Sequence, residues 1–537
     1  MKRIVEASAT LPADRFAARI VAHALIEQIQ SAPRPDLVDR FADQAVAAGW
    51  SEVEVLLRHS QVLHSSLQGR PADEVRANCD AMRQAAEAFG DEILIALALA
   101  SRALFLDDGD AATGEDLGGG LARAVAILEQ IADSEPDELG LRALELPNAF
   151  VECGNVYHQQ GLWELEDEMY QRACDALTRP LPESARHVGD HTRRVLVVNR
   201  LEGVTTLVSA LIEVGQRDRA RAVARDATRP SPAERAELPP AWAIEMRALE
   251  YFLDAVVDST AGGDEGGELW DALAESTWHG YRACILLADA VRAADAGDVA
   301  RSVEVATRAA GLLGDHRSSI TTLAWYLAAQ SASEESAAAG YARRLAGLRW
   351  QDRLGMLAAA RARLTAERVL RESEQLSRQA LADGLTGLAN RHAETRFVAR
   401  LRGRGEQNRL AVVLLDVDHF KSVNDTFGHA VGDKVLQVIG AVLQAAVRTS
   451  TDLAVRRGGD EFMLLVDLSG RPEVSFRVDD VVRAVADHDW NAVAPGLRVS
   501  VSAGHASGAA NRVDELTEAA DEQLYRAKAA GRGRALG

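Results

Sequence analysis

The chain has 537 residues, which at roughly 150 residues per domain predicts three or four structural units. Apolar residues make up 47% and charged residues 26%, as in ordinary globular proteins, and the net charge is −20 at pH 7. This acidic balance excludes broad nucleic-acid binding, which needs a basic surface, but it leaves nucleotide substrates open because a few local cations suffice to hold phosphates.

The cysteines form no C-x-x-C pair, so the sequence predicts neither a zinc site nor a disulfide framework. We expect buried free thiols in a reducing cytoplasm. The four residues are Cys79, Cys153, Cys174 and Cys284.

No segment is predicted to cross a membrane. The most apolar stretch, residues 93–106, is interrupted by Arg102 and is shorter than the roughly 20 residues that a membrane helix needs. Residues 1–40 carry charges throughout and show no apolar core of a signal peptide. We therefore expect a cytoplasmic protein.

Residues 1–345 are rich in Ala, Leu, Arg and Glu, with apolar residues at three- and four-residue spacing, which predicts helices with one buried face. The segment 150–173 resembles a tetratricopeptide repeat, with Gly154 and Tyr157 at a close helix contact, Gly161 at the turn, and Tyr170 and Ala173 on the second helix. Two further segments show the pattern at matching offsets: Leu207, Leu211, Gly215, Ala220, Ala227 and Pro232, and then Leu286, Gly297, Ala306 and Ala309.

The alternative for this region is an irregular helical domain without true repeats. In either case it contains no catalytic constellation. Stacked helical hairpins offer a concave surface, so we expect a regulatory or interaction region with a protein or peptide partner.

Residues 346–380 contain no proline and predict one connecting helix. Small and apolar residues recur at alternating three- and four-residue steps, which indicates a coiled-coil seam of modest strength. A single connecting helix without self-association is the alternative. The seam consists of Ala359, Ala362, Ala366, Val369, Ser373, Leu376 and Ala380.

Residues 381–537 predict an α/β sandwich. The β-branched run 410–415 predicts a buried strand that ends at Asp416, and a helix follows over 433–447. Two short strands, 453–457 and 462–466, are separated only by a Gly-Gly-Asp-Glu turn, which predicts a β-hairpin. A further strand is expected at 498–502 and a last amphipathic helix at 515–530.

Two carboxylates are expected to meet at one edge of this sheet. Asp416 lies at the end of the first strand and Asp460 at the tip of the hairpin, so they come together if these strands are neighbours. Paired carboxylates with carbonyl and phosphate oxygens suit Mg²⁺, which prefers hard oxygen ligands.

Four motifs in this region resemble those of the GGDEF family of diguanylate cyclases. The match covers about residues 381–537, and it implies a nucleotide-cyclase-like fold that joins two GTP molecules into cyclic di-GMP. The motifs are Asp383–Arg391 (DGLTGLANR), Asp416–Asp425 (DVDHFKSVND) continuing to Gly432-Asp433, Gly458–Phe462 (GGDEF), and Tyr525–Lys528 (YRAK) followed by Gly531-Arg532.

The resemblance implies a metal site and catalytic roles. Asp416, Asp460 and the carbonyl of Val417 would hold Mg²⁺ or Mn²⁺. Asp460 would also help to deprotonate the attacking 3′-hydroxyl, and Glu461 would assist with a second metal or with the hydroxyl. Lys421 would stabilise charge on the transferred phosphoryl group.

The resemblance also implies the contacts to GTP. The backbone amides of His419 and Phe420 would cradle phosphates at a helix start. Lys528 and Arg532 would reach the outer phosphates, unless they are merely a solvated basic helix end. The two residues that would recognise guanine are Asn424 and Asp433.

The inhibitory product site of the family, Arg-x-x-Asp, is degenerate here. Asp452 occupies the acidic position, but Thr449 stands where the arginine is expected and Arg448 is one residue out of register. Without the bidentate guanidinium, we expect weak or absent product inhibition.

The sequence therefore predicts a multidomain cyclase. It comprises a helical regulatory region over 1–345, a connecting helix over 346–380 and a catalytic domain over 381–537. Each catalytic domain would hold one GTP, so a homodimer is required. The alternative is a catalytically silent module that serves as a nucleotide-responsive interaction scaffold.

Overall fold

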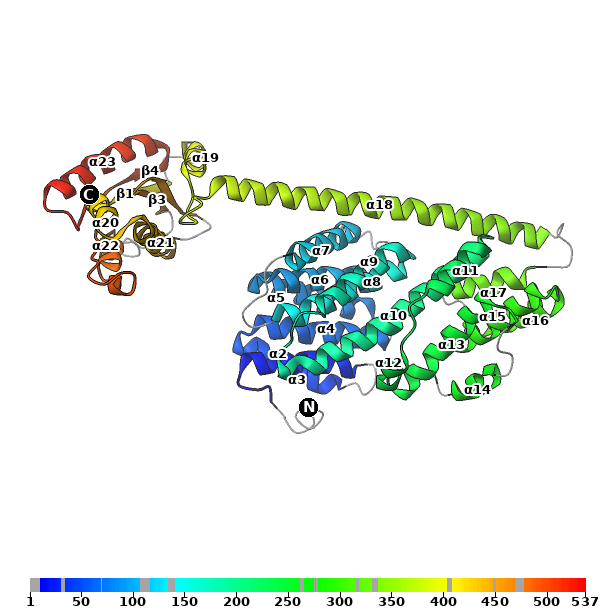
Figure 1. Ribbon diagram of the computed structural model, residues 1–537. Helices are drawn as coiled ribbons and strands as arrows, with labels where there is room; N and C mark the ends of the chain where they lie inside the picture. Colours follow the sequence, from blue (N-terminus) through cyan, green and yellow to red (C-terminus); the bar gives the residue numbers. More distant parts are fainter. Residues whose placement is uncertain are drawn as a thin grey trace. The chain divides into compact units, whose positions relative to one another are not determined.

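A computed structural model shows the chain as two compact units, 1–369 and 370–537 (Figure 1). The structure describes residues 10–29, 34–68, 70–106, 116–133, 141–260, 265–274, 276, 279–314, 318–330, 337–402, 408–447, 451–468 and 478–537.

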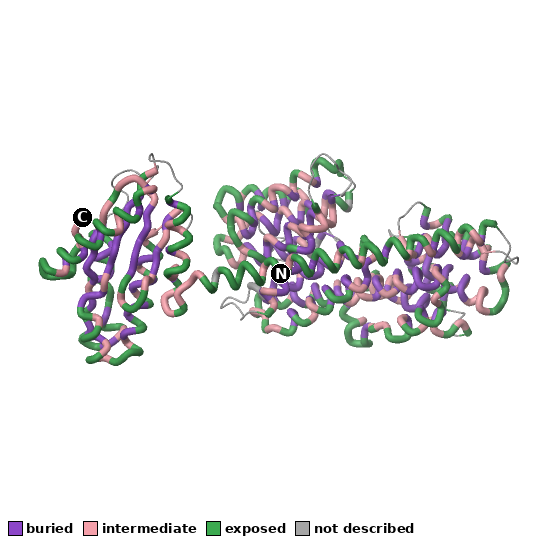
Figure 2. Tube along the Cα trace, turned by 90° about the horizontal axis from the view of Figure 1, so that it is seen from above, coloured by how far each residue is buried: buried purple, intermediate pink, exposed green. Residues whose placement is uncertain are grey.

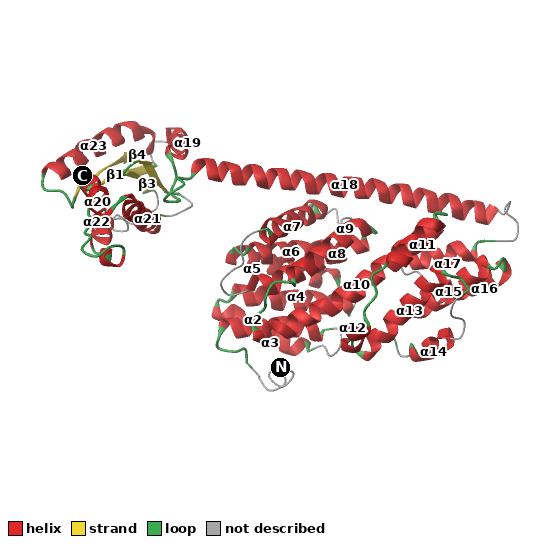
Figure 3. Cartoon of the chain, viewed as in Figure 1, coloured by secondary structure: helices red, strands yellow, loops and turns green. Residues whose placement is uncertain are grey.

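The described part of the first unit is built from helices and contains no strand (Figure 3). Helices adjacent in sequence pack on each other, as α8 does on α9 and α15 on α16. The α-helices are α2 Arg15–Gln28, α3 Pro35–Ala48, α4 Ser51–Leu67, α5 Ala72–Phe89, α6 Glu92–Phe105, α7 Leu117–Ala132, α8 Leu141–Gln159, α9 Trp163–Ala176, α10 Arg186–Glu213, α11 Arg217–Asp226, α12 Pro232–Glu237, α13 Pro240–Val257, α14 Glu265–Ala272, α15 Gly280–Asp295, α16 Val299–Leu313, α17 Ser319–Ala328 and the first part of α18 Ala337–Leu381.

The three predicted hairpins are present. Each turn carries a glycine with positive φ: 68° at Gly161, 79° at Gly215 and 82° at Gly297. A Cβ on Gly154 would lie 2.3 Å from Cε1 of Tyr170, so only glycine allows α8 and α9 to approach this closely. The helical hairpins are thus confirmed, whereas a true tetratricopeptide repeat stays a prediction.

Helix α10 is, among the described helices, the one long and apolar enough to cross a membrane. Its apolar window has a mean hydropathy of 1.6, but 56% of that window is buried inside the unit, where it packs against α8, α9, α13 and α17. A core helix has the same properties. Residues 93–106, the predicted most apolar stretch, fall mostly in the shorter helix α6, and the longer apolar window of α10 was not predicted.

A pair of buried ionisable side chains lies in the first unit. His59 and Glu152 are 6% and 5% exposed, and His59 Nε2 lies 3.9 Å from Glu152 Oε1. Burial raises the pKa of Glu152 to about 7, although hydrogen bonds from Asn155 and Ser101 oppose the rise. Burial also lowers the pKa of His59 to about 4. Both side chains are therefore neutral between about pH 5 and pH 6.

We expect Glu152 to make the helical unit less stable as the pH rises. The unfolded carboxyl ionises near 4.5 and the folded one near 7, so the free energy of unfolding falls by about 1.4 kcal/mol per pH unit between these values. The contribution of Glu152 to the free energy of unfolding is complete below its pKa in the unfolded chain, and it is lost as the pH rises through its pKa in the folded protein. Calorimetry from pH 5 to pH 8 should show Glu152→Gln gaining melting temperature relative to wild type. The exposed Glu87→Gln should show no such trend, and a pH-independent difference for Glu152→Gln would contradict the assignment.

Helix α18 has two different faces within the first unit. One face is docked: Ala346, Arg353 and Leu364 are 2%, 5% and 2% exposed. Four of its arginines pair with glutamates of the helical unit. These pairs are Arg349 with Glu213, Arg353 with Glu164, Arg361 with Glu168, and Arg368 with Glu129, at 2.6–2.9 Å.

The other face of α18 carries the predicted seam. Val369 and Leu376 are 60% and 58% exposed, and Ala359, Ala362 and Ala366 are exposed as well. The helix starts at Ala337, nine residues before the predicted start at 346. The seam residues of the first unit, Ala359 to Val369, thus lie on the side of α18 that the helical unit leaves open.

The second unit is a five-stranded mixed sheet with helices on both faces. The strand order is β2-β3-β1-β4-β5, antiparallel except between β4 and β5. The strands are β1 Arg409–Val417, β2 Leu453–Gly458, β3 Glu461–Asp467, β4 Val501–Ala509 and β5 Ala535–Leu536. The helices are α19 Arg391–Arg402, α20 Phe420–Phe427, α21 His429–Ala446, α22 Val478–Ala486 and α23 Val513–Ala529.

Strand β1 is central, and its residues alternate between two cores. Val413, Leu415 and Val417 face α21 and α22, whereas Leu410, Val412 and Leu414 face α19 and α23. Figure 2 shows these buried strands in purple. The predicted strand at 498–502 is partly wrong, because β4 begins only at Val501 and Ser500 instead contacts Asp418.

Candidate active site

The predicted acidic edge forms where β1 ends beside the β2–β3 turn. Asp416 is paired in register with Glu461 across the antiparallel β1 and β3, and the amide of Val417 donates to the carbonyl of Asp460 at 3.2 Å. The turn contains Gly458 with φ 150° and Gly459 with φ 56°, the second of which is a left-handed conformation that favours glycine. The structure therefore brings Asp416, Asp460 and Glu461 together.

Arg456 fixes the backbone of this turn. Its Nε and Nη2 donate to the carbonyl of Gly459 at 3.0 and 2.8 Å, while Nη1 donates to Asp383 at 3.0 Å. Asp383 Oδ1 also accepts from the amide and hydroxyl of Thr386, and these contacts hold the pKa of the Asp383 carboxyl below its usual value despite partial burial. The first motif of the domain is thereby tied to the Gly-Gly turn, a link the sequence analysis missed.

The ionised form of Asp416 is disfavoured by burial and by two neighbouring acidic side chains. Burial raises its pKa, and Asp460 and Glu461 raise it further, whereas Lys528 lowers it. Lys528 Nζ lies 2.8 Å from Asp416 Oδ2. A cation at this edge is therefore favourable, and the pairing with Lys528 was not foreseen.

The donor set fits a divalent ion that binds together with phosphates. Among the described residues, no three His, Cys, Asp or Glu side chains form a metal site by themselves. Mg²⁺ is commonly held by one or two carboxylates, with substrate phosphates and waters completing the octahedron. Asp416 and Asp460, which the structure brings to the same edge, are residues of the type that such an incomplete set needs.

The turn between β1 and α20 presents backbone amides. His419 caps α20 in a left-handed conformation, with φ 54°. Helical bonding starts beyond it, since the amide of Ser422 donates to the carbonyl of His419 at 2.8 Å. The amides of His419 and Phe420 precede that bond at a helix start, where anions are favoured, and the Lys421 side chain is exposed beside them.

The two predicted guanine-binding residues lie on adjoining helices. Asn424 is in α20 and Asp433 is near the start of α21. A Cβ on Gly432 would lie 1.9 Å from Oδ1 of Asn424, so this glycine leaves the space that the Asn424 amide occupies. Asp433 is exposed.

Asp418 is a supporting residue that the sequence analysis missed. It is 6% exposed, and its carboxylate accepts hydrogen bonds from Ser500 Oγ and Ser502 Oγ, both at 2.6 Å, and from the amide of Gly533 at 2.9 Å. It thereby fixes the end of β1 to β4 and to the C-terminal loop that carries the exposed Arg532. The available signal was a second aspartate two residues after Asp416.

Of the degenerate product site, the structure describes the acidic position, Asp452. Thr449 and Arg448 lie outside the described residues. Asp452 is 5% exposed, and its Oδ1 accepts from the amide of Asp467 at 3.0 Å. Its carboxylate is therefore already engaged within the sheet.

Residues 380–534 match the family model described as diguanylate cyclase, GGDEF domain. The C-terminal unit is a GGDEF domain. The match leaves out the helices before residue 380, so the GGDEF domain accounts for the C-terminal part of the chain alone.

Three known proteins illustrate the similarity. Diguanylate cyclase DgcS of Shewanella oneidensis is 36% identical over 162 residues, which cover 30% of this chain and 53% of DgcS. Diguanylate cyclase DgcP of Pseudomonas aeruginosa is 37% identical over 167 residues, 30% of this chain and 24% of DgcP. The solved coiled coil and GGDEF domain of DgcB from Caulobacter crescentus, in complex with c-di-GMP, is 28% identical and covers 34% of this chain and 96% of that chain, with a TM-score of 0.28. The chain spans about half or less of the length of these two curated relatives.

Proposed function

We propose that the protein is a cytoplasmic diguanylate cyclase that condenses two GTP molecules into cyclic di-GMP and releases two pyrophosphates. The observation that carries this proposal is the acidic edge of the GGDEF domain, where Asp416, Asp460 and Glu461 meet beside Lys528. The family model and the curated relatives support the same reaction for this domain.

The residues of this edge divide the reaction between them. Asp460 accepts the proton of the attacking 3′-hydroxyl, and Lys421 stabilises charge on the transferred α-phosphoryl group. Each 3′-oxygen forms a bond to the α-phosphorus of the other GTP as the bond to pyrophosphate breaks. Asp416, Asp460 and the carbonyl of Val417 would hold Mg²⁺ or Mn²⁺, which would neutralise phosphate charge and favour ionisation of the hydroxyl. Glu461 assists at the same edge.

The remaining predicted residues bind the substrate. The amides of His419 and Phe420, with Lys528 and Arg532, hold the phosphates. Asn424 and Asp433 recognise guanine. Guanine presents N1–H and N2–H₂ donors, so a carboxylate acceptor binds guanine in preference to adenine. Lys528, which pairs with Asp416 in this structure, would pair with a phosphate where Asp416 holds the metal.

The substitution Gly432→Ala should raise the KM for GTP at least tenfold with a smaller change in kcat. The new Cβ would lie 1.9 Å from Asn424 Oδ1, so the amide has to leave its place. Steady-state kinetics with GTP measure this effect. The matched substitution Gly311→Ala on α16, where a Cβ meets nothing within 4 Å, should leave both constants unchanged. An unchanged KM in Gly432→Ala would contradict the role of Asn424.

A homodimer completes the reaction centre, because each domain holds one GTP. We propose that two copies of α18 pair along the exposed seam that includes Val369 and Leu376. The helical unit holds the opposite face of α18 through Arg349, Arg353 and Arg368. The helical region, residues 1–345, would act as a repeat-like regulatory surface for a protein or peptide. It precedes the connecting helix and the catalytic domain, which begins at residue 381.

Product inhibition should be weak. Thr449 cannot supply the guanidinium that pairs with a guanine–phosphate edge, and the Asp452 carboxylate is held by the amide of Asp467. Initial rates at fixed GTP should stay flat as cyclic di-GMP is added. Half-inhibition at low micromolar product would show that a working inhibitory site exists.

Pyrophosphate release tests the proposed chemistry. The purified chain should release pyrophosphate from GTP but not from ATP, and a chelator should stop the release. If GTP binds and no pyrophosphate appears, the domain is the silent, nucleotide-responsive scaffold instead. Release from ATP at the same rate would contradict the role of Asp433.

A further inference from the structure

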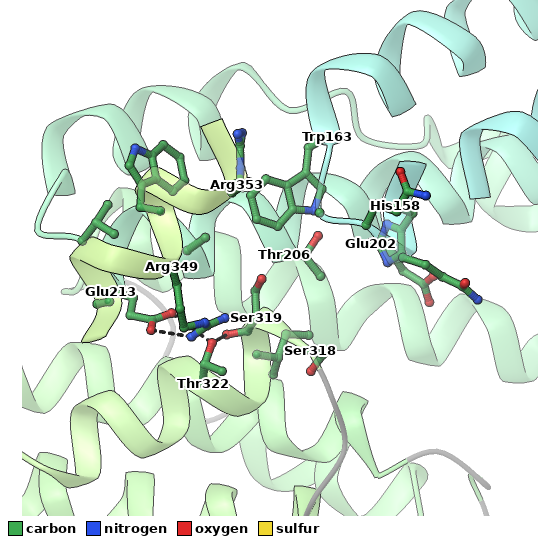
Figure 4. Close-up of a pocket in the computed structure, with 18 of the residues that line it drawn as sticks. His158, Trp163, Glu202, Thr206, Glu213, Ser318, Ser319, Thr322, Arg349 and Arg353 are labelled. Atoms are coloured by element: carbon green, nitrogen blue, oxygen red, sulfur yellow. Dashed lines mark hydrogen bonds and ion pairs between the residues drawn. The ribbon is translucent and has the colours of Figure 1, made fainter. Parts of the chain in front are cut away.

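A large pocket lies within the helical unit. Its volume is about 1140 Å³, above the roughly 300–1,000 Å³ typical of small-molecule sites. The pocket is lined mainly by helix α10, the turn before α9, the start of α17 and helix α18. Figure 4 shows His158 and Glu202 toward one side of the pocket and Arg349, Glu213 and Thr322 toward the other.

The first side of the pocket is acidic. Glu202 accepts a hydrogen bond from the hydroxyl of Tyr281 at 2.7 Å, and no arginine or lysine of the described chain forms an ion pair with it. Burial raises the pKa of the Glu202 carboxyl, and Tyr281 and His158 oppose the rise. His158 is itself paired with Glu166 at 3.0 Å. A ligand cation would compensate the Glu202 carboxylate.

The opposite side is suited to an acidic group. Arg349 donates to Glu213 at 2.7 Å and keeps 42% of its side chain exposed. The ten-residue helix α17 begins at the same place, with Ser318 as its cap and Ser319 in its first turn. A helix N-terminus with an adjacent guanidinium attracts a carboxylate.

Arg353 forms part of the pocket wall. Its side chain is 7% exposed and lies between the rings of Trp163 and Trp350, at 4.7 and 4.5 Å. Nη2 pairs with Glu164, but Nε and Nη1 are buried and have no hydrogen-bond partner among the described residues. The protein itself shields these two nitrogens, so Arg353 shapes the pocket wall through its stacking on the two indole rings.

The spacing of the two sides sets the size of the ligand. Glu202 and Glu213 are both on α10, and eleven residues at 1.5 Å each put them about 16 Å apart. That span matches about five residues of extended chain. We propose that this pocket binds a short extended peptide of about five residues, with a basic group at Glu202 and an acidic group at Arg349.

Occupancy of the pocket bears on α18, because Arg349, Trp350 and Arg353 belong to that helix. A peptide carboxylate competes with Glu213 for Arg349 and changes how the helical unit holds α18. Control of cyclic di-GMP synthesis by this route rests on the proposed cyclase function, whereas peptide binding itself does not.

Equilibrium dialysis of the full chain against blocked pentapeptide pools tests the proposal. The first pool is Ac-Lys-X-X-X-Asp-NH₂, and two others replace Lys by Gln or Asp by Asn. We expect each replacement to lower retention at least tenfold. Glu202→Gln should abolish the preference for Lys alone, and Arg349→Gln the preference for Asp alone, while Arg349→Lys should keep it.

Surface variants and two outcomes complete the test. Arg301→Gln and Glu304→Gln, an exposed pair on α16, should leave both preferences intact. A fourth pool, Ac-Gln-X-X-X-Asn-NH₂, carries neither charge. The proposal is wrong if the protein retains none of the charged pools better than this neutral one. It is also wrong if the preferences for Lys and Asp persist in the Glu202 and Arg349 variants. Neither outcome depends on cyclase activity, so the two proposals fail separately.

Discussion

Replacing Asp460 by alanine is expected to lower cyclic di-GMP synthesis by at least about a thousandfold, which corresponds to about 4 kcal/mol of transition-state stabilisation. The substitution removes a carboxylate from the edge where Asp416 and Glu461 are paired across β1 and β3. Both the metal site and the acceptor for the 3′-hydroxyl proton are lost with it. Product formation under saturating GTP and Mg²⁺ measures the effect.

The matched control is Asp521→Ala, an exposed aspartate on α23 outside the proposed site. It should keep wild-type activity, and circular dichroism should show both variants folded. Substantial activity in Asp460→Ala would remove the assignment of this side chain to the metal and to the proton transfer. The acidic turn would then be structural only.

Placing charge on the seam of α18 should separate the subunits. The double substitution Val369→Glu and Leu376→Glu puts four carboxylates at one dimer interface, at positions that are 60% and 58% exposed in the single chain. Proximity of two bound reactants contributes up to roughly 7–11 kcal/mol, so we expect activity to fall at least a hundredfold at equal protein concentration. Sedimentation velocity measures the change in mass.

Gln375→Glu is the control for the seam, since residue 375 lies one position before Leu376 and points away from the seam on a 3.6-residue helix. It should leave both mass and activity unchanged. The reverse change, Ala362→Leu with Ala366→Leu, should tighten the dimer. A seam variant that stays dimeric and active would mean that the subunits meet through another surface.

Much of the acidic edge was predictable because its determinants are local. A buried β-branched run that ends in an aspartate and a hairpin closed by two glycines predicted that Asp416 and Asp460 approach each other if their strands are neighbours, and β1 and β3 are neighbours. The hairpin turns at Gly161, Gly215 and Gly297 were visible for the same reason, since positive φ at a turn favours glycine over other residues.

The contacts that sequence reasoning missed join distant segments. Asp418 is bonded to Ser500, Ser502 and Gly533, which lie 82 to 115 residues further along the chain. Lys528 reaches Asp416 from the last helix. No local spacing encodes such pairs, because they depend on how β1, β4 and α23 are placed side by side.

Helix α18 shows a different limit. The periodicity of small residues identified its seam, but the docked face is made of arginines, a tryptophan and scattered apolar residues. Arg353 and Leu364 share that face, which a hydrophobic pattern does not identify. The pocket beside it could not be predicted either, because its residues come from seven helices and from the turn before α9.

Product identity tests the central claim most directly. The purified full chain is incubated with GTP and Mg²⁺, and the products are separated by chromatography and identified by mass spectrometry. We predict cyclic di-GMP and pyrophosphate in a ratio of one to two. Recovery of unchanged GTP from folded, dimeric protein, or a product other than cyclic di-GMP, would contradict the account.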